Sequence, residues 1–172
     1  MNYFVKSNPA RCIGCRTCLI SCVVAHEGKR IFEIDPDGYQ FNPRLFMVKT
    51  ARLSTPVQCK HCENPACKAA CTSNAITVEG NAVVVNAKKC IGCKNCVIAC
   101  PFGAVEIVET AEVQADGSVK KIANKCDLCA GVADSPSCVK VCITEALELV
   151  TGDAISVSLA EKRKNAALCQ GQ

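Results

Sequence analysis

The chain has 172 residues, a length that suits one or two small domains, and its formal net charge is +4. Cysteine accounts for 17 residues, aromatic residues make up only 4% and tryptophan is absent, so the chain offers few large side chains for an ordinary core. The scattered lysines argue against a nucleic-acid partner, and no stretch approaches the ~20 apolar residues of a membrane-spanning helix.

Local patterns predict short strands joined by turns. Residues 35–38, with the sequence Asp-Pro-Asp-Gly, begin a turn-rich stretch before a strand expected over residues 44–49. Three hairpins are predicted further on, each from two runs of branched aliphatic residues around a glycine-containing turn. The predicted hairpins pair residues 76–78 with 83–85, 105–108 with 119–122, and 147–150 with 155–157.

The C-terminal segment predicts a helix of about ten residues. Residues 158–161, Ser-Leu-Ala-Glu, fit a capping box, and good helix formers follow as far as Leu168. We expect a surface helix that closes the domain, and the alternative is a docking or self-association element. Cys169 is predicted to be a free surface thiol, with a role between molecules as the alternative.

Sixteen of the 17 cysteines fall into four quartets, each of which begins C-x2-C and ends with a cysteine four residues after the one before it. The first and third quartets read C-x2-C-x2-C-x3-C throughout. After the other three quartets, but not after the first, an alanine follows the last cysteine by four residues and a branched aliphatic residue comes next, which marks an internal repeat. The quartets are Cys12, Cys15, Cys18 and Cys22; Cys59, Cys62, Cys67 and Cys71; Cys90, Cys93, Cys96 and Cys100; and Cys126, Cys129, Cys138 and Cys142.

Thiolates at this spacing favour iron–sulfur chemistry. A C-x2-C-x2-C loop can present three cysteines to three corners of a [4Fe–4S] cube, and in two-cluster ferredoxins the fourth cysteine of one run binds the other cube. Sixteen cysteines therefore predict four [4Fe–4S] clusters in two interlocked pairs. Since each oxidised cube with four thiolates carries about −2, the protein with its clusters has a formal charge of about −4.

Disulfides and zinc are the competing interpretations of the cysteines. Three cysteines directed at one centre do not suit disulfide pairing, and structural zinc sites usually take two C-x2-C pairs about 12–20 residues apart. The triplets here have one cysteine too many for that zinc pattern. The gap over residues 130–137 leaves the fourth quartet open to an altered site.

The two histidines lead to different expectations. His61, between Cys59 and Cys62, is predicted to donate to a cluster and tune its potential rather than to bind iron. His26 has no partner pattern and is predicted to be solvated. Because sixteen cysteines fill sixteen cluster corners and no phosphate-binding or dinucleotide-binding glycine motif is present, we expect no catalytic residue.

The whole chain resembles the four-cluster, ferredoxin-like iron–sulfur subunits of molybdenum and tungsten oxidoreductases. These include subunits of formate dehydrogenases, dimethyl sulfoxide reductase and formate hydrogenlyase. It looks closest to the small cytoplasmic members that serve formate dehydrogenase and hydrogenase, and to those of hydrogen-dependent carbon dioxide reductase. The motifs that carry the resemblance are CIGCRTC at 12–18, NPR at 42–44, CENPAC at 62–67, CIGCKNC at 90–96 and CPFGA at 100–104.

The resemblance implies an α+β fold of two interlocked bacterial-ferredoxin-like domains with short β-hairpins and short helices. The outer domain would comprise residues 1–58 with 123–157, the inner domain 59–122, and the C-terminal helix and tail 158–172. Thr72 and Ile143 depart from the family pattern, which commonly has proline after the last cysteine. The implied ligand sets are Cys12, Cys15, Cys18 and Cys142; Cys22, Cys126, Cys129 and Cys138; Cys59, Cys62, Cys67 and Cys100; and Cys71, Cys90, Cys93 and Cys96.

In function, the resemblance implies a non-catalytic subunit that relays single electrons. Its partners would be a formate dehydrogenase-type molybdenum or tungsten subunit and a hydrogenase or other redox subunit. An N-terminus without an apolar leader or a twin-arginine pair favours a cytoplasmic protein without a direct membrane span. The alternatives are a scaffold or filament-forming subunit whose main role is assembly, and a cluster-delivery protein.

Overall fold

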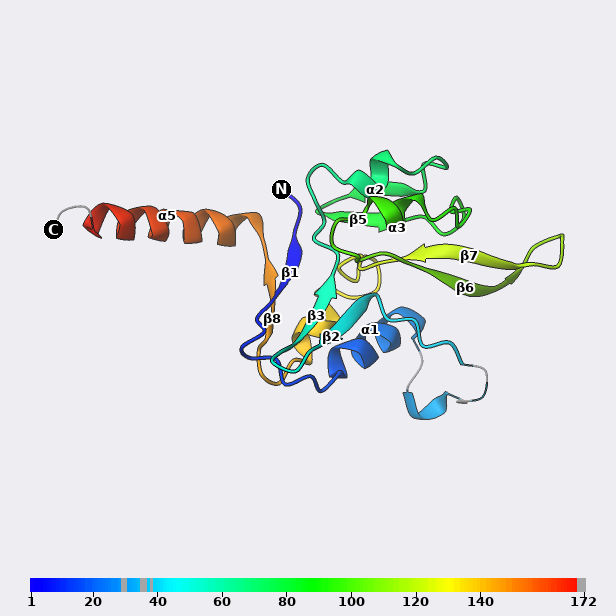
Figure 1. Cartoon of the computed structure of the whole chain (residues 1–172), viewed down its shortest axis with the longest axis horizontal. Coiled ribbons are helices and arrows are strands. Elements are labelled where there is room, and N and C mark those ends of the chain that lie inside the picture. Colours follow the sequence, from blue (N-terminus) through cyan, green and yellow to red (C-terminus); the bar gives the residue numbers. More distant parts are fainter. Residues whose placement is uncertain (29–30, 35–36, 38, 170–172) are drawn as a thin grey trace.

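The computed structural model describes residues 1–28, 31–34, 37 and 39–169. Short helices and two-stranded antiparallel sheets alternate along the chain, which confirms the mixed α and β character predicted (Figure 1). In chain order the elements are β1 (Phe4–Ser7), α1 (Thr17–Glu27), the 3₁₀ helix η1 (Ile31–Glu33), β2 (Leu45–Lys49), β3 (Ser54–Gln58), α2 (Ala66–Ala69), β4 (Ile76–Glu79), β5 (Ala82–Val85), α3 (Asn95–Ala99), β6 (Glu106–Val113), β7 (Val119–Asn124), α4 (Ser137–Lys140), β8 (Leu147–Val150) and α5 (Gly152–Cys169).

Two of the three predicted hairpins are confirmed. β4 and β5 pair from Ile76 opposite Val85 to Glu79 opposite Ala82, around the turn that contains Gly80. β6 and β7 also pair, and both strands run beyond the predicted ranges. Their hairpin extends away from the body of the molecule (Figure 1).

The third predicted hairpin is wrong. β8 pairs with the N-terminal strand β1, with Phe4 opposite Val150 and Ser7 opposite Leu147. Val5 and Leu147 are both buried in one core, so this pairing covers apolar side chains that a local hairpin would leave open. Residues 155–157, the expected partner strand, lie instead within α5.

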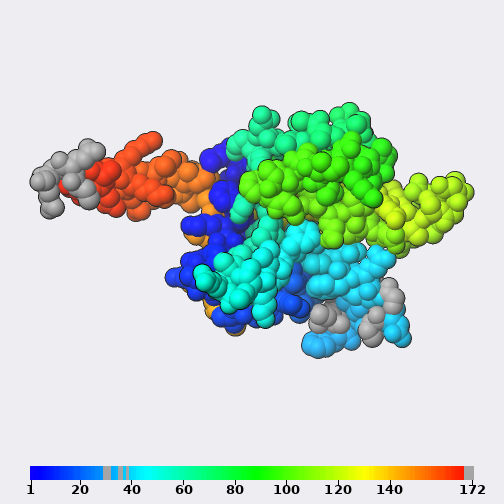
Figure 2. Space-filling view, viewed as in Figure 1, coloured from blue at the N-terminus to red at the C-terminus, as the bar shows by residue number. Residues whose placement is uncertain are grey.

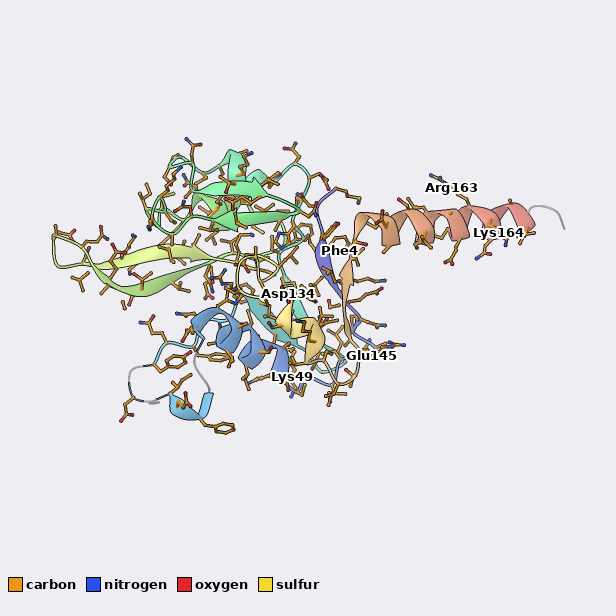
Figure 3. The ribbon with its side chains drawn as sticks, turned by 180° about the vertical axis from the view of Figure 1, so that it is seen from behind. Phe4, Lys49, Asp134, Glu145, Arg163 and Lys164 are labelled. Atoms are coloured by element: carbon orange, nitrogen blue, oxygen red, sulfur yellow. The ribbon has the colours of Figure 1, made fainter. Side chains whose placement is uncertain are left out.

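The C-terminal helix begins earlier than predicted. α5 has 18 residues from Gly152, and the Thr151 hydroxyl accepts the Ala154 N–H at 3.3 Å, as a residue preceding a helix does. Ser158, the predicted cap, therefore lies inside the helix. α5 projects from the body, and the labelled Arg163 and Lys164 lie along its projecting part (Figures 2 and 3).

The strand expected at 44–49 is confirmed as β2, but its partner β3 was not predicted. β3 contains Pro56, which lacks a backbone N–H and is tolerated because each strand of a two-stranded sheet has a free edge. The turn prediction at 35–38 falls mostly on residues outside those described. Near the quartets, α2, α3 and α4 are short as expected, whereas α1 continues for 11 residues.

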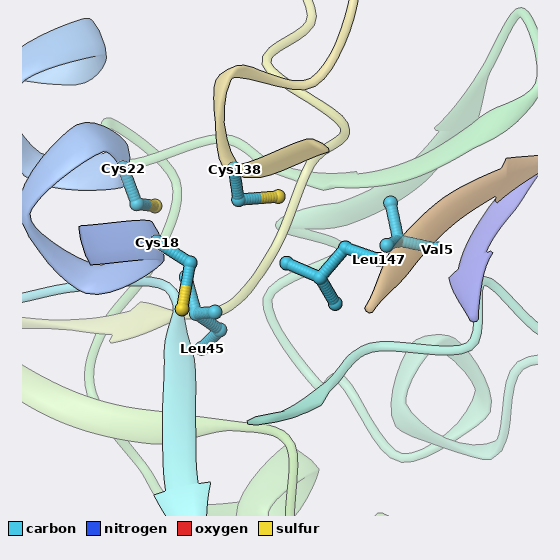
Figure 4. Close-up of a cluster of buried hydrophobic side chains, with 6 residues drawn as sticks. All are labelled: Val5, Cys18, Cys22, Leu45, Cys138 and Leu147. Atoms are coloured by element: carbon cyan, nitrogen blue, oxygen red, sulfur yellow. The ribbon is translucent and has the colours of Figure 1, made fainter. Parts of the chain in front are cut away.

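The core is divided into two clusters of buried side chains, and cysteines contribute to both. The first cluster draws on both ends of the chain, and Figure 4 shows its cysteines beside Val5, Leu45 and Leu147. The second lies around β4, β5 and α3. The first contains Val5, Cys18, Cys22, Leu45, Cys138 and Leu147, and the second contains Cys67, Ile76, Val83, Cys96, Val105 and Ala123.

Candidate metal centres

Three cavities each bring together three cysteines of one quartet and the last cysteine of another. The sixteen cysteines of the quartets are all free thiols, so no disulfide links them. We call the groups site 1, site 3 and site 4. Site 1 is lined by Cys12, Cys15, Cys18 and Cys142, site 3 by Cys59, Cys62, Cys67 and Cys100, and site 4 by Cys71, Cys90, Cys93 and Cys96.

The remaining four cysteines form site 2, which comprises Cys22, Cys126, Cys129 and Cys138. Burial is the main cause that raises the pKa of Cys138, and the neighbouring charges of Cys126, Cys22 and Cys129 raise it further. Helices α1 and α4 pack together and carry Cys22 and Cys138 into the same core (Figure 4). Site 2 thus takes three cysteines from the fourth quartet and one from the first.

Neighbouring sites are connected in a definite order. Burial and the cysteines of its own site are the larger causes that raise the pKa of Cys138 in site 2. The charge of Cys18 in site 1 raises it further. Cys126 of site 2 interacts in the same way with Cys59 of site 3, and Cys96 of site 4 with Cys67 of site 3. These pairs link site 1 to site 2, site 2 to site 3 and site 3 to site 4.

The alanine that repeats after three quartets donates its backbone N–H to the last cysteine of the quartet. The N–H···Sγ distances are 3.3 Å from Ala75 to Cys71, 3.4 Å from Ala104 to Cys100 and 3.2 Å from Ala146 to Cys142. In each case the residue just before the alanine has a left-handed φ of 50–59°, which turns the N–H back toward the sulfur. The three alanines are buried, so a small side chain suits the position.

The first quartet lacks this tail, and its last cysteine finds a different donor. Because α1 continues past Cys22, the sulfur accepts its N–H from Arg44 instead, at 3.4 Å. Arg44 immediately precedes β2. A backbone donor is therefore supplied to Cys22 by a segment 22 residues away.

His26 is not solvated as predicted. Its side chain is only 10% exposed, its Nε2 lies 2.9 Å from Asp127 Oδ1, and Arg44 donates to the other oxygen of the same carboxylate. Burial would lower the pKa of His26, but the bonds to Asp127 and to Cys22 outweigh it and raise the pKa to about 10. Asp127 is 101 residues away along the chain, so no local pattern could have revealed this partner.

The residue before the second cysteine of each quartet has a positive φ. It is Gly14 (φ 68°), His61 (φ 46°), Gly92 (φ 66°) or Leu128 (φ 61°), and glycine adopts this conformation without steric cost. A side chain at Gly92 would also stand 2.7 Å from the backbone oxygen of Lys121. Close packing and backbone conformation together explain the glycine in both C-I-G-C motifs.

His61 is buried, with 1% of its surface exposed. Its Nδ1 accepts the Val83 N–H at 2.9 Å, and burial, together with the charge of Lys125, lowers its pKa to about 3. The ring is therefore neutral and carries its proton on Nε2, which has no hydrogen-bond partner among the described residues. The predicted donation from His61 to a cluster stays a prediction, and this orphaned donor is compatible with it.

The donor sets fit iron–sulfur clusters. Each site offers four thiols, and backbone N–H groups at sulfur favour the negative charge of cluster ligands. Near Cys71 and Cys142, burial raises the thiol pKa, but the hydroxyl of Ser73 or Thr144 and the alanine N–H outweigh it and lower the pKa. Among the described residues, no three His, Cys, Asp or Glu side chains are placed to hold a single metal ion.

No helix in the described part of the chain is long and apolar enough to cross a membrane.

Comparison with known proteins identifies the family. Residues 50–152 match the family described as the 4Fe-4S dicluster domain. HydN, an electron transport protein of Escherichia coli, is 38% identical over 175 residues, which cover 98% of this chain and 99% of HydN. Component A of hydrogenase-4 from the same organism is 36% identical over 195 residues, covering 97% of this chain and 91% of that protein.

A third relative is much longer than this chain. AegA of Escherichia coli is 42% identical over 164 residues, which cover 95% of this chain but only 24% of AegA. The chain thus spans about a quarter of AegA and nearly all of HydN. As the resemblance predicted, the chain belongs to the 4Fe-4S dicluster family of iron–sulfur electron-transfer proteins of oxidoreductases.

Proposed function

We propose that this chain holds four [4Fe–4S] clusters and relays single electrons between two partner redox subunits. The observation that carries the proposal is the grouping of cysteines into sites 1 to 4, each with three cysteines of one quartet and the last of another. When bound, the clusters supply one-electron redox chemistry. The ligands would be the four cysteines of each site.

The chain itself would hold the clusters, shield them from water and tune their reduction potentials. Its thiolates would bind iron, its N–H groups donate to sulfur, and its apolar side chains keep water from the sites. Four cysteines at a site give every iron of a cube a protein ligand. With no open coordination position, the proposed role is that of a carrier rather than an enzyme.

The order of the sites supports a path for electrons through the molecule, with sites 1 and 4 at its ends. Cys15 of site 1 and Cys93 of site 4 are exposed, and the neighbouring side chains of Ile13 and Ile91 are 63% and 68% exposed. Sites 2 and 3 lie between them in the order of electrostatic contacts. Electrons would therefore enter and leave at sites 1 and 4, where exposed apolar side chains could contact partner subunits.

The two proposed domains follow from the same arrangement. Sites 1 and 2, the β1–β8 pairing and the first core cluster draw on both ends of the chain, which supports an outer domain of residues 1–58 with 123–157. Sites 3 and 4 and the second core cluster support an inner domain of residues 59–122. The separate C-terminal helix starts at Gly152 rather than at residue 158.

The cluster count and the ligand sets can be tested on the anaerobically prepared protein. About sixteen iron atoms and sixteen acid-labile sulfides per chain are expected, and values near eight would contradict four clusters. Cys22→Ser should alter the electron paramagnetic resonance (EPR) signal that Cys126→Ser also alters. If Cys22→Ser instead altered the signal affected by Cys12→Ser, the crossed ligand sets would be wrong.

The proposed partners are a formate dehydrogenase-type molybdenum or tungsten subunit and a hydrogenase or other redox subunit. The relatives named as an electron transport protein and a hydrogenase component support this choice. Purification of the native chain under mild anaerobic conditions, followed by identification of what travels with it, tests the proposal. Stable partners without redox centres would contradict it.

A second candidate function, assembly of a complex or filament, is favoured by α5. The helix has 18 residues, its side chains from Ser156 to Leu168 are exposed, and these include Val157 and Leu159. Because most helical stability in proteins comes from packing rather than from intrinsic propensity, a covering partner would stabilise this exposed helix. Truncation after Thr151, followed by measurement of particle mass, tests the role, because an unchanged mass would show that α5 does not mediate assembly.

A further inference from the structure

The residue that precedes the first cysteine differs between the quartets in a way that follows the site order. Arg11 and Lys89 precede the first and third quartets and are exposed. Gln58 and Lys125 precede the second and fourth quartets, and each is only 2% exposed. The two buried residues thus precede the quartets that supply the middle sites. The second quartet gives three cysteines to site 3, and the fourth gives three to site 2. One of the two buried residues is a lysine.

Lys125 lies at the junction of sites 2 and 3. Its Nζ donates to the backbone oxygen of Val83 on β5 and, at 2.6 Å, to that of Cys126 in site 2. The charge of Lys125 also reaches the Cys59 thiol of site 3, where it opposes the rise in pKa that burial causes. These two carbonyl oxygens hold the Nζ in place between β5 and site 2.

No carboxylate is paired with Lys125 among the described residues. The nearest candidate in the sequence, Asp127, is already bonded to His26 and Arg44. A buried ammonium without a counter-ion is unfavourable unless negative groups surround it. The groups available here are thiols, and the charge of Lys125 acts on Cys59, Cys67 and Cys126, which belong to sites 2 and 3.

We propose that Lys125 is a fixed positive charge shared by sites 2 and 3, which raises the reduction potentials of the clusters held there. The inference rests on the proposed four-cluster function. Reduction adds one electron, supplied by the donor subunit, to a cluster that is already negative. A nearby ammonium in a buried setting stabilises that added charge. Because the charge is shared, it favours an electron on either side of the junction between the two middle sites.

Lys125→Met removes the charge with little change in side-chain volume. In an EPR-monitored redox titration of the cluster-loaded chain, we expect reduction of two of the four clusters to become about tenfold less favourable. For a one-electron couple this corresponds to a potential about 59 mV lower. Lys125→Gln, which keeps hydrogen-bonding groups but no charge, should shift the same two clusters. Lys125→Arg should stay close to the wild-type potentials.

Lys89→Met is the matched control, because Lys89 occupies the same position before its quartet but is exposed. Water and salt screen its charge, so the equilibrium constant for reduction of each of the four clusters should change less than twofold. Full cluster content with unchanged potentials in Lys125→Gln would overturn the proposal, even if Lys125→Met lost clusters. An iron content near eight in the wild type would instead contradict the four-cluster function, so the two failures are distinguishable.

Discussion

The first and third quartets have the same cysteine spacing but continue into different structures. After Cys100 comes Pro101, α3 ends, and Ala104 returns its N–H to the sulfur. After Cys22 comes Val23, α1 continues for more than a turn, and Arg44 supplies the N–H from a distant segment. The comparison shows that the spacing of the cysteines leaves open how the last sulfur is supported. Whether the helix ends before the last cysteine, as α3 does, or continues past it, as α1 does, distinguishes the two cases.

The long-range support of the first quartet can be broken at Asp127. Asp127→Asn removes the charge that binds His26 and Arg44, and we expect the free energy of unfolding to fall by about 3 kcal/mol, because a buried and a partly exposed cation lose their partner. An anaerobic thermal melt that follows cluster absorbance measures the effect, and site 2 should lose its cluster first. Asp116→Asn, in an exposed turn, is the control and should leave the melt unchanged. Equal melts for the two variants would show that the contact contributes nothing.

The pairing of His26 with Asp127 makes the stability of the folded protein depend on pH. Against the effect of burial, pairing lowers the pKa of Asp127 and raises that of His26 to about 10. The contribution of Asp127 is lost as pH falls through its lowered pKa. That of His26 is complete below its unfolded value of about 6.5 and is lost as pH rises through about 10. The difference between wild type and Asp127→Asn should therefore be largest near pH 5–6.5 and shrink toward pH 10; a difference that grew at high pH would contradict this assignment.

The glycines of the two C-I-G-C motifs provide a matched pair across the compared quartets. Both have a left-handed φ, but a Cβ at Gly92 would meet the backbone oxygen of Lys121, whereas one at Gly14 would meet the side-chain hydroxyl of Ser54. A side chain can move away more easily than backbone. We expect Gly92→Ala to cost about 3 kcal/mol and Gly14→Ala about 1–2 kcal/mol. Thermal melts of the two variants measure the difference, and the reverse order would contradict the contact geometry.

The smallest effect is expected at the residue before the repeated alanine. Glu145 holds a left-handed φ of 50° where Gly103 stands in the third quartet. Glu145→Gly should relieve that conformation and raise stability by up to about 1 kcal/mol, less the entropy that glycine adds to the unfolded chain. Gly103→Glu, the converse exchange, should destabilise by a similar amount. A thermal melt that fell in both variants would show that conformation at this position is not the controlling factor.

Contacts between segments close in the sequence could be predicted, whereas the contacts between distant segments could not. The β4–β5 and β6–β7 hairpins were predictable because branched aliphatic runs flank their own turns. The β1–β8 pairing and the bond between His26 and Asp127 were not, since neither partner carries a local sign of the other. α5 was placed too late because Ser158 looked like a cap, while the Thr151 hydroxyl already occupies that role at the true start.

In the candidate sites, the cysteines themselves were visible in the sequence, but their surroundings were not. The repeated alanine was noticed as a pattern, and the structure supplies its reason, a backbone donor for sulfur. The burial of Lys125 had no signal at all, because Lys89 stands in the same position before its quartet and is exposed. The long-range bond from the Lys125 Nζ to the Val83 carbonyl on β5 accompanies its burial.

The pairing of β1 with β8 has a consequence for biosynthesis. During translation, every cysteine of sites 3 and 4 has been made once residue 100 is complete, so the inner half of the molecule can close first. Strand β1 and the first quartet, although made before sites 3 and 4, must wait for Cys142 and for β8 before they find their partners. This segment is made before the inner half but completed after it, so its four cysteines stay without their partners, and open to oxidation, until Cys142 has been made.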